Sequence, residues 1–158
     1  MKKPINSYTL YEGNFLTTAP VLDRTINILM FRDPSDQEYQ IIINRTTLAE
    51  DQTVEDWYEL ETENLRNKLP GFQSEGKLLK DEIGPTKLPI IQIANRYLND
   101  GDIIRQVLSI ISLPKNSTYN PEGREIIIFN LNTKNEFTDY QRQHYVRVIN
   151  SFSPNMDD

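Results

Sequence analysis

The chain has 158 residues and a formal net charge of -6, and it contains no cysteine. This length suits a single domain, which we expect to span residues 1–158 with a core over about residues 7–153. The acidic balance argues against nucleic acid, whose binding depends on Lys and Arg side chains that neutralise phosphate, and the lack of cysteine excludes disulfides and thiolate metal ligands.

The first 45 residues predict three strands joined by a connector and a turn. Residues 8–11 form a short candidate strand, and residues 17–24, which include Pro20, read as a connector. A second strand is expected over residues 26–31, and the Arg-Asp-Pro-Ser-Asp sequence that follows it is typical of a turn. Residues 39–45, centred on three consecutive isoleucines, are the next predicted strand.

The first helix is expected from Thr53 to about Leu69, where a Pro-Gly pair stops it. Thr53 and Asp56 have the spacing of a capping box. The apolar side chains cover about half of the helix circumference, which is wider than the stripe needed to face one core. These side chains are Val54, Trp57, Tyr58, Leu60, Leu65 and Leu69. The helix is therefore expected to face the sheet and also to border a second apolar surface.

The strongest local signal is a β-hairpin about the Asp-Gly pair at residues 100–101, which pairs Arg96 with Arg105. One face would carry apolar residues typical of a core: Ile91, Ile93, Tyr97, Ile104, Leu108 and Ile110. The other face mixes aliphatic and polar residues: Ile90, Gln92, Ala94, Arg96, Leu98, Ile103, Arg105, Val107, Ser109 and Ile111. This second face is too apolar for water and too polar for an ordinary core, so we expect something to dock on it.

The remaining segments complete the expected fold. Residues 72–83 are a weaker strand candidate, residues 114–124 read as an exposed loop, and residues 125–130 predict a last strand. The final helix starts at Thr138 and has one apolar face, formed by Tyr145, Val148, Ile149 and Phe152. The expected class is α+β: an antiparallel twisted sheet with helices packed on it.

The residue inventory offers no recognisable catalytic or metal-binding constellation. His144 is the only histidine, and no cysteine can join it as a nucleophile or a ligand. No glycine-rich phosphate loop and no G-x-S-x-G motif is present in the sequence. We therefore expect no enzyme activity, no catalytic residue, no metal and no cofactor.

Two groups of polar residues leave alternatives open. Arg96 and Arg105 would repel each other across the hairpin unless an anion lies between them. They either reach water or carboxylates of the same chain, or they hold an acidic or carbonyl group of a partner. A similar choice, between partners in the same chain and a docked segment, applies to four amides: Asn27, Gln92, Asn95 and Gln106.

Sequence signals for the membrane are missing from the chain. No apolar run approaches the ~18 residues of a membrane span, so we do not expect a membrane-embedded protein. The first residues lack the apolar core of a signal peptide, and no cysteine can carry a lipoprotein anchor. The simplest expectation is a cytoplasmic protein.

Four stretches, in their order and spacing, resemble the Eag chaperones, the effector-associated adaptors of bacterial type VI secretion. They are Tyr-Thr-Leu-Tyr-Glu-Gly at 8–13, Thr-Ile-Asn-Ile at 25–28, Leu-Pro-Gly-Phe at 69–72 and Arg-Gln-Val at 105–107. That family lies within the DcrB-like, PsbP-related (Mog/PsbP-like) fold group. The resemblance implies a cytoplasmic homodimer that shields the N-terminal transmembrane helices of a PAAR/Rhs-type effector and supports its loading on the secretion spike.

The resemblance also implies a groove for the client helices. The family's groove residues map onto Ile26, Ile28, Leu65 and Leu69, although relatives also carry a smaller residue at the third of these positions. We expect these residues to form one groove with part of the mixed hairpin face. The further expected members are Asn27, Gln106, Val107 and Ile103. The extra N-terminal residues and the loop at 114–124 depart from the family pattern, so client choice and dimer details stay open.

The sequence leaves three other functions open. A carrier of a lipid or another apolar small molecule would use the same cavity. A small enzyme would need a constellation that the sequence does not show. A structural subunit of a photosystem-type or periplasmic complex, as in other members of the fold group, would be expected to carry a signal sequence.

Overall fold

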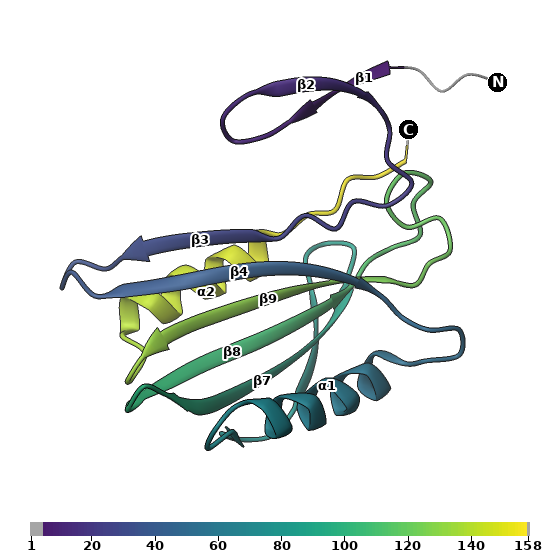
Figure 1. The fold of residues 1–158 in the computed structure, drawn as a ribbon. Coiled ribbons are helices and arrows are strands. Elements are labelled where there is room, and N and C mark those ends of the chain that lie inside the picture. The colour runs from purple at the N-terminus through teal and green to yellow at the C-terminus, as the bar shows by residue number, and fades with distance from the viewer. Residues whose placement is uncertain (1–4, 158) are drawn as a thin grey trace.

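The structure, a computed structural model, describes residues 5–157 (Figure 1). Its elements run in the order β1 (Ile5–Thr9), β2 (Asn14–Thr18), β3 (Asn27–Arg32), β4 (Glu38–Thr47), α1 (Val54–Lys68), β5 (Gln73–Ser74), β6 (Leu79–Ile83), β7 (Leu88–Asn99), β8 (Asp102–Ser112), β9 (Glu125–Lys134) and α2 (Asp139–Ser151). Strands β1 and β2 pair only with each other, and the other strands form one large sheet.

The large sheet is antiparallel throughout and has the strand order β3-β4-β9-β8-β7-β5, with β6 also paired to β7. Helix α1 lies against one face and α2 against the other (Figure 1). The predicted α+β class, an antiparallel sheet with helices packed on it, is confirmed. The expectation of one domain over residues 1–158 stays a prediction.

The β7–β8 hairpin forms with the predicted register. Arg96 faces Arg105, and the turn is built by Asp100 and Gly101, whose φ angles of 51° and 85° lie in the left-handed region. Glycine adopts that region freely and aspartate tolerates it, so the Asp-Gly pair fixes the turn and with it the pairing of the two strands.

Helix α1 begins at the predicted Thr53 cap, whose side chain accepts from the Asp56 backbone N–H. Its Val54, Trp57 and Tyr58 pack on one face of the sheet, over strands β7, β8 and β9. The buried residues of this contact are Ile91, Ile93, Leu108, Ile110, Ile126 and Ile128. Four residues of the predicted core face of the hairpin, Ile91, Ile93, Leu108 and Ile110, therefore form a core under α1. The other two, Tyr97 and Ile104, lie outside this cluster, and Tyr97 is only half-buried.

Helix α2 covers the opposite face, which the sequence predicted to be open for docking, and this prediction is wrong. Tyr145 and Ile149 of α2 are buried against that face. The Tyr145 hydroxyl donates to Ser109 Oγ at 2.6 Å and to the Phe129 carbonyl at 3.2 Å. The polar groups that made this face look unlike a core are thus satisfied within the chain.

The two facing arginines also find partners in the chain. Arg105 Nε lies 3.3 Å from Glu75 Oε1, and Arg96 donates to Gln73 Oε1 through Nε and Nη2 at 3.2 and 2.8 Å. Both acceptors come from the segment around β5, at the edge beside β7. The structure therefore agrees with the reading in which the arginines are paired within the chain.

The segment at 114–124 is more ordered than the expected exposed loop. Asn120 is fully buried; its Nδ2 donates to the carbonyls of Leu113 and Pro114 at 3.1 Å, and its Oδ1 accepts from the Glu125 N–H at 2.9 Å. Asn116 is also buried and donates to the Asn155 carbonyl at 3.1 Å. The loop and the C-terminal tail are therefore held together by asparagine side chains.

Two other predictions are corrected in detail. The single strand expected at 8–11 is a hairpin, β1–β2, closed by a bond from the Leu10 N–H to the Gly13 carbonyl at 2.7 Å. The strand expected at 72–83 is split into β5 and β6, and Gly76, with a φ of 124°, lies in the break.

Candidate binding groove

The sheet face under α1 is only partly covered, and the uncovered part lies at the β3 edge. Ile26, Ile28 and Met30 alternate along this edge and are 59%, 62% and 57% exposed. Because side chains two residues apart share one face of a strand, all three point to the α1 side, as does Ile42, which pairs with Ile28. An apolar strip therefore runs beside the helix without being covered by it.

A cavity of about 460 Å³ lies between α1 and this strip. Trp57, Glu61 and Leu65 line it from the helix, and Ile26 lines it from the edge of the sheet. The floor is formed by residues of β4, β8 and β9, namely Asn44, Thr46, Gln106, Leu108, Ile128 and Asn130, and Arg24 and Arg45 complete the lining. The helix thus faces the sheet with one side and borders a second surface with the other, as its wide apolar arc predicted.

The floor of the groove changes from apolar to amide along the strands. One row of cross-strand neighbours is Ile93, Leu108, Asn130, Ile42 and Ile28. The next row, two residues further along each strand, is Asn95, Gln106, Asn132, Gln40 and Met30. We call the four amides of this second row the amide row. It crosses four adjacent strands on the groove face.

The amides of this region have unused hydrogen-bonding capacity. Asn130 Nδ2 donates to Gln106 Oε1 at 3.1 Å, but Asn130 Oδ1 has no partner among residues 5–157. Asn95 is 1% exposed, and neither its Oδ1 nor its Nδ2 has a partner in the same part of the chain. A buried amide without a hydrogen bond costs on the order of 1–3 kcal/mol, so the unpaired groups of Asn95 and Asn130 lower the stability of the free chain.

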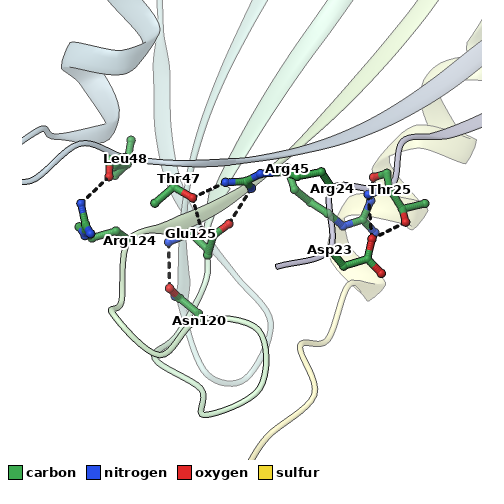
Figure 2. Close-up of polar contacts among 9 residues, drawn as sticks. All are labelled: Asp23, Arg24, Thr25, Arg45, Thr47, Leu48, Asn120, Arg124 and Glu125. Atoms are coloured by element: carbon green, nitrogen blue, oxygen red, sulfur yellow. Dashed lines mark hydrogen bonds and ion pairs between the residues drawn. The ribbon is translucent and has the colours of Figure 1, made fainter. Parts of the chain in front are cut away.

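A polar network holds the segment before β3, which borders the groove at Ile26, in place (Figure 2). Arg24 forms an ion pair with Glu125 at 3.0 Å and also donates to Thr47. Arg45 donates to the Thr25 carbonyl at 2.5 Å and to Asn27 Oδ1 at 2.9 Å. These bonds fix the segment before β3, and therefore the position of Ile26, against the end of β4.

Asp23 belongs to the same segment. Hydrogen bonds from Thr25 and then from Tyr8 lower the pKa of the Asp23 carboxyl below its usual range. The Tyr8 hydroxyl donates to Asp23 Oδ2 at 2.5 Å. The ionised carboxylate therefore joins the β1–β2 hairpin to the connector that leads into β3.

The predicted site residues divide between the two sheet faces. Ile26, Leu65 and Gln106 meet in the cavity, and Ile28 lies on the same face along the exposed strip. Leu69, the C-cap residue of α1, is half-buried at the far end of the helix and does not line the cavity, so its place in the groove stays a prediction. The expectation that the groove is open rather than sealed in the interior therefore agrees with the exposed side chains of Ile26 and Ile28.

The structure does not bring the other three predicted residues into the groove. Asn27, Ile103 and Val107 lie on the opposite sheet face, and Val107 packs on the core beneath α2. Each differs by an odd number of positions from a groove residue of its own strand, and neighbouring side chains of a strand point to opposite faces. Their assignment to one groove with Ile26 is wrong for that reason.

Several groove residues were missed. Met30 follows Ile26 and Ile28 at the strand period, so alternation along the edge would have found it. Asn130, Asn132 and Gln40 carry no such signal, because they join Gln106 only through the pairing of β4 with β9 and of β9 with β8. That pairing involves strands far apart in the sequence.

A second cavity of about 560 Å³ lies where the connector before β3, the loop at 114–124 and the C-terminal tail converge. Its lining is rich in apolar side chains, among them Val21, Leu22, Leu113, Tyr119, Ile127 and Phe152. Among residues 5–157, no cluster of three or more His, Asp or Glu side chains has the arrangement of a metal site. Neither of the two described helices combines the length and apolar character needed to cross a bilayer.

Comparison with known proteins gives a family and a fold. The DcrB family model matches residues 12–151. A crystal structure of PA94 from Pseudomonas aeruginosa, a protein of unknown function, is similar with a TM-score of 0.72 at 17% identity, over 96% of this chain and 97% of that one. LpqN, involved in cell envelope biogenesis of Mycobacterium tuberculosis, is similar with a TM-score of 0.50 at 17% identity, over 84% and 76% of the two chains. No curated protein sequence matches.

Proposed function

This chain belongs to the DcrB family, and from that premise we propose that it is a non-enzymatic chaperone or adaptor of the Eag type. In this proposal it binds the N-terminal transmembrane helices of a PAAR/Rhs-type effector in the cytoplasm and shields them from water. It then supports loading of the effector on the type VI secretion spike. Following the resemblance, it works as a homodimer, without a cofactor or a metal.

The observation that carries the proposal is the half-covered groove beside α1. Ile26, Ile28 and Met30 leave an apolar strip open to solvent in a single row. Covering apolar surface stabilises a complex by roughly 25 cal/mol per Å², so a helix that covered a few hundred Å² of the strip would gain several kcal/mol before the costs of association. The strip is thus a suitable surface for an apolar helix that must be kept from water.

The amides on the groove floor support a transmembrane client in particular. Transmembrane helices associate through close packing of small residues and through hydrogen bonds between polar side chains. The groove offers apolar contact along β3 and, on its floor, Asn130, whose Oδ1 has no partner among residues 5–157. A helix with one hydrogen-bond donor at that level would satisfy this oxygen, whereas a uniformly apolar ligand would not.

Co-expression with the hydrophobic N-terminal segment of a PAAR effector encoded beside this protein tests the proposal. Ile28→Asp should reduce the recovered client at least about tenfold, because burial of an unpaired carboxylate costs more than the ~1.4 kcal/mol of a tenfold change. Leu29→Asp is the matched control. Leu29 is the next residue of the same strand, is 43% exposed and faces the other side of the sheet, so recovery should be unchanged. Full recovery with Ile28→Asp would reject the groove.

The second cavity favours one alternative, a carrier of a lipid or another apolar small molecule. Its volume of about 560 Å³ falls in the range of small-molecule sites, and its lining is largely aliphatic and aromatic. Native mass spectrometry of the purified protein separates the two functions. A carrier would show a bound molecule of defined mass that is lost in a Val21→Asp variant, and a chaperone would not.

A further inference from the structure

The N-terminal hairpin β1–β2 presents apolar side chains to solvent. Tyr8 and Phe15 stack at 5.2 Å between ring centroids, and Leu10 continues the same face towards the turn. Tyr11 at the turn is fully exposed, and Leu16, on the second face, is 75% exposed. The surface of a soluble protein seldom carries this many large apolar side chains on so short a segment unless something covers them.

The rest of the described chain does not provide that cover. The hairpin forms a sheet of its own, and it stands away from the large sheet as an arm (Figure 1). None of its side chains belongs to either hydrophobic core among residues 5–157. Its contacts with the connector are polar: the Tyr8 hydroxyl bonds to Asp23 at 2.5 Å and to Thr25 at 2.9 Å. The arm is thus held by its base, where Tyr8 is half-buried and lines the second cavity, whereas Leu10, Tyr11, Phe15 and Leu16 remain exposed.

A lone hairpin of this kind is not expected to be stable in water, because two strands rarely suffice without a third strand or a packed face. Its edges are also unprotected. Residues 5–22 contain one charged residue, Glu12, whereas edge strands of stable monomers are usually guarded by charges, especially lysine. The edges of β1 and β2 therefore invite pairing with further strands.

We propose that the hairpin is the dimer contact of this protein: the β1–β2 hairpins of two copies pair by their edges across a two-fold axis, and both faces of each hairpin lie against the second copy. Two hairpins together supply four strands, which is above the limit at which a small sheet becomes stable. A second copy is also present whenever the chain is folded, whereas a client is not. The contact is isologous, so each pair of contacting residues occurs twice.

The available area agrees with a stable dimer. Large apolar side chains each bury on the order of 100–200 Å². The exposed ones of each arm, Leu10, Tyr11, Phe15 and Leu16, would bury roughly 1,000 Å² over both copies, close to the lower limit of stable specific interfaces. The charge pattern agrees as well, because two chains of net charge -6 repel least where the surface is uncharged.

A membrane surface is a less suitable partner for the same arm. Residues 5–22 contain no Lys or Arg, so the arm lacks the basic residues that draw peripheral segments to anionic lipid. The excess of acidic residues in the whole chain opposes binding to such a surface further.

Sedimentation of the full chain and of charged variants tests the contact. Phe15→Glu and Leu16→Glu should each raise the dimer dissociation constant about a hundredfold or more, because symmetry places two unpaired carboxylates in one contact. Val146→Glu, at an exposed position of α2, is the control and should leave the dimer intact. Circular dichroism of each variant checks that the large sheet is still folded.

Since a hairpin variant could lose its local fold rather than its contact, a distance measurement is needed too. The chain has no cysteine, so Thr9→Cys and Arg147→Cys each give one site for a nitroxide label. A short distance between two copies is expected for the label at 9 and a longer one for the label at 147. A wild-type monomer, a dimer unaffected by both glutamates, a long distance at 9, or hairpin-dependent binding to lipid vesicles without a dimer would each overturn the inference. Client recovery with Ile28→Asp is scored separately, so the groove and the arm can fail independently.

Discussion

At the scale of single residues, two buried asparagines show the difference between a paired and an unpaired amide. Asn120 is fully buried and makes three hydrogen bonds that hold the loop at 114–124. Asn95 is equally buried and makes none among residues 5–157. The same side chain therefore stabilises the fold at one position and lowers its stability at the other.

Replacement of each asparagine by leucine should change stability in opposite directions. Asn95→Leu should raise the free energy of unfolding by about 1 kcal/mol, because it removes an unpaired buried amide at similar volume. Asn120→Leu should lower it by about 3 kcal/mol, because three backbone groups lose their partner. Urea denaturation measures both values.

The same pair of variants also separates stability from binding. Because Asn95 is 1% exposed and does not line the cavity, Asn95→Leu should leave recovery of the client unchanged although the protein itself is more stable. A loss of stability in Asn95→Leu would show that the Asn95 amide is satisfied in the free protein.

At the scale of elements, the parts that the sequence predicted are those with local causes. Each helix begins at a capping box formed by two residues three positions apart in the sequence, and the register of the β7–β8 hairpin is set by its own turn. The cover of the second hairpin face by α2 could not be predicted in this way, because Tyr145 and Ser109 meet only after the whole sheet has formed. Ile26 and Ile28 were predicted through the resemblance to the Eag family. The amide row was not predicted, since it spans strands whose pairing is not local.

Docking of α2 on the sheet should depend on pH through His144. Its Nδ1 lies 2.7 Å from the Tyr39 hydroxyl, and its ring meets Phe31 edge-on at 4.7 Å between centroids. Burial, and to a lesser extent Arg147, lower the pKa of the His144 imidazole below its usual value. The folded protein therefore prefers the neutral ring, whereas the unfolded chain binds a proton below about pH 6.5.

The sign of the effect follows from this difference. The contribution of His144 to stability is present above about pH 6.5 and is lost as the pH falls from there through the lowered pKa of the folded state. His144→Gln should remove this part of the pH dependence and flatten the difference in melting temperature between pH 7 and pH 5.5. If the melting temperature changed equally with pH in both proteins, His144 of α2 would not be held in its neutral form.

At the scale of the whole molecule, three surfaces have separate tasks in this account. The face under α2 is closed and supplies most of the core. The face under α1 is half open and carries the proposed groove. The β1–β2 arm stands outside both and carries the proposed dimer contact. The bonds of Arg24 and Arg45 hold the connector before β3 beside the groove (Figure 2), and the Tyr8 hydroxyl joins the arm to the same connector.

The central claim is that a transmembrane helix of the client lies on the exposed strip of β3. Site-specific photocrosslinking tests it most directly, with a photoreactive amino acid in place of Met30 on the groove face and, as the control, in place of Leu29 on the other face. A third site, Leu22, reports on the second cavity. We expect crosslinks to the hydrophobic N-terminal helices of the effector from position 30 and none from positions 29 and 22. Crosslinks from 22 or 29 without any from 30 would contradict it.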